Sequence, residues 1–302
     1  MRVDPFYVTN LVGSLDQTQA NVQQLTSELS SGARVTSLSQ DPVASGENVL
    51  LLNQMQQDDS FTQSANLVTG QLQVADSALG SVVTQLTQAI TLATSANNGT
   101  MNSSNVKSIA NQISGILNEV TSLANTSYQG QYIFAGGQTS TAPFVTSTAT
   151  SPATTTYSGD ANVNFLHTPN GQKIQLNMPG NQIFMGTSSN SVFGALNSLI
   201  ADYSSGTVDT NQAVSDTQAL GAALNYVSQQ RVTIDNSMTQ ITAASDAVSN
   251  VQTQLTTAQT NLMQANIPTM TTQLSLAETQ QTALISVIAQ LNSTSNSLFR
   301  KI

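Results

Sequence analysis

Residues 8–29 read VTNLVGSLDQTQANVQQLTSEL, and apolar side chains recur along this stretch at alternating steps of three and four residues. Such steps place side chains on one stripe of an α-helix, at the a and d positions of a heptad repeat. Thr18 fills the one polar step, and Ser31-Gly32 marks the end of the helix. The apolar members of this N-terminal seam are Val8, Leu11, Leu15, Val22, Leu25 and Leu29.

A second stripe with the same spacing lies near the other end of the sequence. We call it the C-terminal seam, and its large apolar members are Leu274, Leu284, Ile288, Leu291 and Leu298, with Gln281 and Ser295 at its polar steps. We predict that the first and last helices pair as a coiled coil. Isolated helices of this length are barely stable in water, so we expect both ends to be loose in a free subunit and ordered among copies. An ordinary intramolecular helical hairpin is the alternative.

Helices are also predicted next to these ends. Asp41 and Pro42 have the residue types of an N-cap and a first helical position, so they are predicted to begin a second helix. Buried stripes follow over 61–96 and 106–123, and a long helical stripe over 220–255 ends at an expected break at Ile267-Pro268. The predicted fold class is mainly α with a small β insert, a long antiparallel coiled-coil helical bundle built from both chain ends.

Residues 138–189 are rich in Ser, Thr and Pro and have no helical period. Thr168-Pro169-Asn170-Gly171 lies between two alternating stretches, which predicts a β-hairpin. We therefore expect three domains. They are a terminal coiled-coil assembly domain (1–40 plus 268–302), a helical rod domain (41–137 plus 190–267) and a small β-rich outer domain (138–189).

The composition excludes several functional classes. Only seven residues are Lys or Arg and the net charge is −9, so nucleic acid and anionic membranes are not expected partners. There is no Cys, and the single His167 lies beside the predicted turn, so we expect no metal, no cofactor and no catalytic centre. The N-terminal stretch lacks the apolar core of a secretory signal, so an exported chain would leave without a cleaved signal peptide.

Three stretches resemble the bacterial flagellin family. Residues 29–46 read LSSGARVTSLSQDPVASG, and residues 274–284 and 291–298 read LSLAETQQTAL and LNSTSNSL. Gln40 stands where the family often has Asp. Within the family the chain is most similar to members that join the flagellar hook to the filament, because YIFAG at 132–136 precedes a small insert.

The resemblance implies a structural subunit, outside the cell in the bacterial flagellum, that leaves through type III export. It implies self-assembly, the first-type hook-associated protein and flagellin as neighbours, and an export chaperone on the C-terminal helix. Flagellin itself is the alternative within the family. From the residues alone, a secreted adhesin with a helical stalk is the alternative outside it.

Overall fold

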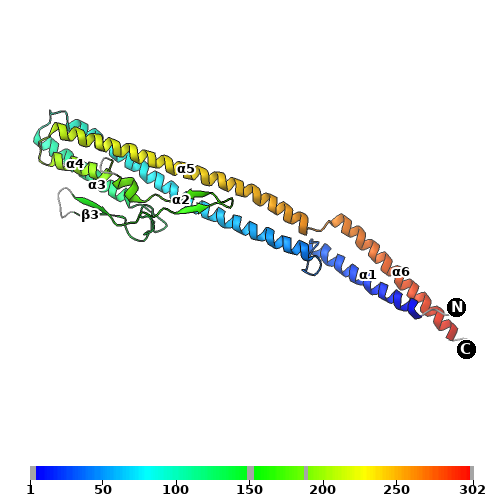
Figure 1. Cartoon of the computed structure of the whole chain (residues 1–302). Coiled ribbons are helices and arrows are strands. Elements are labelled where there is room, and N and C mark those ends of the chain that lie inside the picture. Colours follow the sequence, from blue (N-terminus) through cyan, green and yellow to red (C-terminus); the bar gives the residue numbers. More distant parts are fainter. Residues whose placement is uncertain (1–4, 148–152, 187–189, 300–302) are drawn as a thin grey trace. The chain divides into compact units, whose positions relative to one another are not determined.

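The computed structural model describes residues 5–147, 153–186 and 190–299, and these form two compact units. Unit 1 comprises Met1–Gln57 and Asn250–Ile302, and unit 2 comprises Asp58–Ser249. The unit boundaries lie within two long helices, α2 and α5. The helices are α1 (Pro5–Ser31), α2 (Pro42–Ala96), α3 (Ser103–Ala124), α4 (Val192–Ser204), α5 (Thr210–Met263) and α6 (Ile267–Phe299) (Figure 1).

In unit 1 the first and last helices, α1 and α6, lie side by side (Figure 1). Two backbone hydrogen bonds tie the segment after α1 to the region where α5 ends and α6 is about to begin: Ala265 N donates to Gly32 O at 3.0 Å, and Arg34 N donates to Met263 O at 2.7 Å. Gly32 has φ +67°, the left-handed conformation that favours glycine after a helix. Because α6 starts where α1 ends, the two helices run antiparallel, as the two seams predict.

The sequence predicts a break at Ile267-Pro268, but the break before α6 lies a few residues earlier. It occupies residues 264–266, and both Ile267 and Pro268 lie in the first turn of α6. Asn266 caps this helix, because its Oδ1 accepts a hydrogen bond from Thr269 N at 3.2 Å. Proline is tolerated in a first helical turn, where its missing N–H has no intrahelical partner to lose.

The core of unit 2 is built from the helical stripes that the sequence predicts. Every predicted stripe position of α2 from Phe61 to Ala96 is buried. Asn102 caps α3 by accepting a hydrogen bond from Asn105 N at 2.8 Å. Large side chains with no measurable exposure in this core include Leu79, Leu86, Ile113, Leu196, Leu199 and Leu220. This burial makes unit 2 the hydrophobic centre of the chain.

In the described residues the strands form three separate two-stranded antiparallel sheets. The strand pairs are β1 (Ser127–Tyr128) with β2 (Gln131–Tyr132), β3 (Phe144–Ser147) with β4 (Thr154–Tyr157), and β5 (Phe165–His167) with β6 (Lys173–Gln175). The β5–β6 hairpin turns at 168–171, which confirms the predicted hairpin, and Gly171 has φ +85° there. A π-helix, η1 (Asn181–Met185), follows β6.

An aromatic cluster joins this β region to the helical core of unit 2. The ring centroid of Phe144 lies 5.3 Å from that of Phe184 and 5.1 Å from that of Phe193 on α4. Phe134 packs edge-on against Phe184, with centroids 5.4 Å apart. Strands of two to four residues cannot bury a core of their own, so they depend on these rings for stability. Within the described ranges, no helix has the length and apolarity that crossing a membrane requires.

Candidate assembly site

The centre of the α1–α6 contact is a small apolar cluster. Leu25 is 8% exposed and Ala277 is 5% exposed, and Met270 is buried with them. Val22 and Leu274 pack against this cluster and stay partly exposed. The structure therefore brings members of the N-terminal and C-terminal seams together near the end of α1 and the beginning of α6.

Outside this cluster the seam is only half covered. The remaining described apolar members of both seams are half-buried; they are Leu11, Leu15, Leu29, Leu284, Ile288 and Leu291. The side chains of Val8 and Leu298 lie outside the described part of the structure. By contrast Val12 and Leu276, on other faces of the same helices, are 43% and 68% exposed. Full burial of a leucine contributes about 1.5–3 kcal/mol, so leucines that stay partly exposed leave part of that stabilisation unused.

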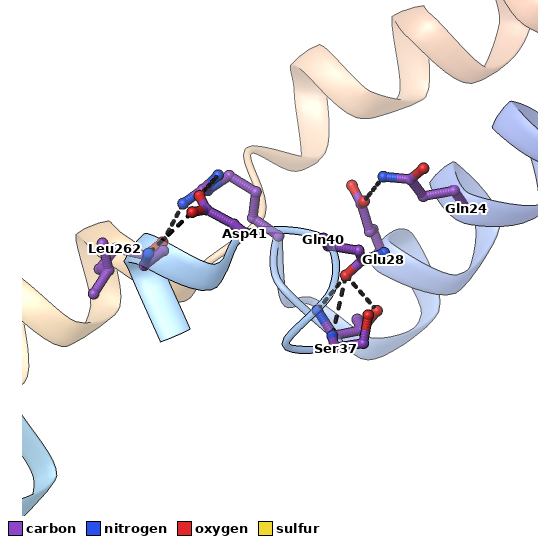
Figure 2. Close-up of polar contacts among 9 residues, drawn as sticks. Gln24, Glu28, Ser37, Gln40, Asp41 and Leu262 are labelled. Atoms are coloured by element: carbon purple, nitrogen blue, oxygen red, sulfur yellow. Dashed lines mark hydrogen bonds and ion pairs between the residues drawn. The ribbon is translucent and has the colours of Figure 1, made fainter. Parts of the chain in front are cut away.

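One buried residue of α1 was missed from the sequence. Glu28 is 6% exposed although it lies outside the predicted stripe, and Gln24 Nε2 donates a hydrogen bond to its Oε1 at 2.8 Å (Figure 2). A buried carboxyl group needs such donors, because burial without them is unfavourable. Its position three residues after Leu25 was the available signal, since that spacing keeps a side chain near the same helix face.

The connection between α1 and α2 is held by side-chain contacts. Arg34 Nη1 forms an ion pair with Asp41 Oδ2 at 3.1 Å, and Arg34 Nη2 donates to Leu262 O at 3.0 Å (Figure 2). Gln40 Oε1 accepts hydrogen bonds from Thr36 N at 2.7 Å and from Ser37 N at 3.1 Å. Because these bonds fix the connection both within itself and to Leu262, it has a defined conformation.

Asp41 and Pro42 lie where the sequence predicts a helix start. Pro42 is the first residue of α2, and Asp41 Oδ1 accepts a hydrogen bond from Ala44 N at 3.0 Å. That N–H lowers the pKa of Asp41, and the neighbouring Arg34 guanidinium lowers it further. The carboxylate therefore stays ionised over a wide pH range, as a cap at the positive end of a helix requires.

Unit 1 also exposes apolar side chains that the seams do not include. Leu38 in the connection is 70% exposed, and Val43 and Leu50 on α2 are 78% and 70% exposed. Val43 and Leu50 are seven residues apart, so they lie on the same face of α2. Exposed apolar groups that gather on one unit are typical of interaction sites. The sequence pattern did not reveal this face, because the stripes recognised in the second helix begin at residue 61.

Comparisons with known proteins agree with this arrangement. Residues 8–139 match the bacterial flagellin N-terminal helical region. The flagellar hook-associated protein 3 of Salmonella typhimurium is 30% identical over 187 residues, which are 62% of this chain and 57% of that protein. The protein of the same name in Escherichia coli is 33% identical over 139 residues, 46% of this chain and 44% of that protein. The chain thus spans about half the length of these curated relatives.

Solved structures show the same fold. A hook-associated protein structure from Vibrio parahaemolyticus matches with a TM-score of 0.67 at 17% identity, covering 74% of this chain and all of that one (100%). Hook-associated protein 3 from Legionella pneumophila matches with a TM-score of 0.62 at 13% identity, covering 70% of this chain and 98% of that one. The fold is therefore mainly α and flagellin-like. The resemblance to the flagellin family, and within it to hook-associated protein 3, is confirmed.

Proposed function

We propose that this chain is a structural subunit of the bacterial flagellum that joins the hook to the flagellin filament through coiled-coil assembly of its two ends. One observation carries the proposal. The helices from the two ends of the sequence form an antiparallel pair whose seam is mostly half-buried. Packing against further copies would cover the partly exposed seam positions and so stabilise the pair. The names of the curated relatives support the same role.

The proposed partners follow from this role. They are other copies of the chain, the first-type hook-associated protein on the hook side, flagellin on the filament side, and an export chaperone that holds the C-terminal helix before assembly. The proposed location is the extracellular flagellum, reached by type III export. The proposed activity is structural rather than enzymatic, and within the described residues no group of His, Asp and Glu has a metal-binding arrangement.

The domain roles are part of the same proposal. Residues 1–40 plus 268–302 would assemble, 41–137 plus 190–267 would form a helical rod domain, and 138–189 would form the outer β-rich domain. We also infer that α1 and α6 are loosely paired in the free subunit and become ordered among copies. The half-buried seam supports this inference, because each partly exposed leucine contributes less than its full burial energy.

Electron microscopy of a deletion strain tests the junction role. The expected result is cells with hooks but no filaments, with flagellin released into the medium, and filaments restored when the gene is returned. Loss of filament mass alone, with flagellin no longer produced, would instead identify the chain as flagellin. Filaments of normal number and length in the deletion strain would refute both roles.

A further inference from the structure

Two carboxyl groups face each other at one corner of unit 2, where α4 ends and α5 begins. The Asp202 and Asp216 carboxyls lie within hydrogen-bonding reach of each other, one on each helix. The Oδ2 atom of each is buried and has no donor among the described residues. Asp216 is only 8% exposed, and its other oxygen accepts a hydrogen bond from Gln212 Nε2 at 3.1 Å.

The groups around this pair do not neutralise it. Asp209, in the connection between the two helices, adds a further negative charge. The Tyr203 hydroxyl donates elsewhere, to Asn97 Oδ1 at 2.8 Å and Ala93 O at 3.3 Å. Lys107 on α3 lies beside the same connection. Its Cε is 2.9 Å from the point where residue 206, a glycine, would carry a Cβ.

Two neighbouring carboxyl groups, each with a buried oxygen that has no donor, repel each other when both are ionised, and one proton turns the repulsion into a hydrogen bond. We propose that Asp202 and Asp216 share one proton that fastens α4 to the start of α5, making this corner a pH-responsive latch that loosens near neutral pH. A metal ion is the other way to satisfy paired carboxylates. Within the described ranges no third His, Asp or Glu joins them to form a metal-binding group.

The sign of the pH dependence follows from electrostatics. Burial and, after it, the neighbouring carboxyls of Asp216 and Asp209 together raise the pKa of Asp202 from 3.8 to about 6. Between pH 3.8 and about pH 6 the folded chain therefore keeps a proton on this group, whereas the unfolded chain has released it. The stabilisation is complete below pH 3.8 and is lost as the pH rises through about 6.

Carboxyl-carbon NMR of the full chain, labelled at aspartate, tests the shared proton directly. One Asp signal is expected to titrate near pH 6, and substitution of Asp202 or Asp216 by Asn should identify it. Amide exchange is the second measurement. After correction for intrinsic rates, protection at the end of α4 and the start of α5 should fall about tenfold between pH 5 and pH 7.5.

Asp202→Asn supplies a permanent donor in place of the proton, so its protection should be equal at the two pH values. Asp246→Asn, an exposed change on the same helix α5, is the matched control and should keep the wild-type pH dependence. The proposal is wrong if no aspartate titrates above about pH 5. It is also overturned if Asp202→Asn keeps the pH dependence, or if added Ca²⁺ restores protection at pH 7.5, which would show a cation site instead. If the variant does not fold, the titration of the wild-type chain decides alone.

Discussion

Replacing Leu25 with Ala removes the largest buried side chain from the α1–α6 seam. Leu25 is 8% exposed and packs with Met270, Ala277 and two partly exposed neighbours. Leucine-to-alanine changes in full cores cost about 2–5 kcal/mol, and this cluster is small, so we expect about 2–3 kcal/mol. If the two ends pair only on assembly, the whole of this free-energy loss weakens the binding of the chain to the hook. It corresponds to roughly a 30- to 140-fold weaker affinity.

Co-sedimentation of the purified chain with isolated hooks measures that affinity. Leu67→Ala is the matched control, because it removes the same atoms from an exposed position of α2 in unit 2, where Leu67 is 50% exposed. The control should dock like the wild type. Thermal unfolding of unit 2 should be unchanged in Leu25→Ala. Wild-type docking by Leu25→Ala, or an equal loss in the control, would refute the reasoning.

Three further changes test unit 2 by thermal unfolding. Gly70→Ala would place a Cβ 2.5 Å from the Tyr128 hydroxyl, so it should lower the midpoint temperature of unfolding. Adding Tyr128→Phe should recover part of the loss, and an unchanged midpoint in Gly70→Ala would contradict this contact. Arg231→Met breaks an ion pair in which Arg231 donates two hydrogen bonds to Asp76, at 2.7 and 3.0 Å. Because the pair is partly exposed, we expect the unfolding free energy to fall by about 1 kcal/mol and the midpoint temperature by roughly 2–4 °C. A fall well beyond this range would mean that the pair does more than link α2 and α5. Phe184→Ala empties the aromatic cluster and should cost about 3–5 kcal/mol, and a change under 1 kcal/mol would contradict that cluster's role.

The helical stripes could be predicted because burial repeats with the period of the helix. Every stripe position predicted for α2 between Phe61 and Ala96 is buried, and the two seams meet as α1 and α6. The break before α6 was misplaced because a Pro restricts its predecessor in most contexts, whereas Pro268 lies in a first helical turn capped by Asn266.

Other features depend on tertiary contacts that local patterns do not encode. Glu28 is buried although its residue type is usually exposed. The β segments were expected as an insert with its own structure, yet Phe144 and Phe184 pack with Phe193 of a helix. Asp202 and Asp216 lie on different helices and form no sequence motif. Only the fold brings these groups together.

Amide exchange before and after docking onto isolated hooks tests the central claim most directly. In the free chain, residues 8–29 and 274–298 should exchange much faster than residues 61–96. Once the chain is docked, all three segments should be protected to a similar degree. Two results would contradict an assembly in which the two ends become ordered. One is that the terminal segments are already as protected as residues 61–96 in the free chain. The other is that they stay unprotected after docking.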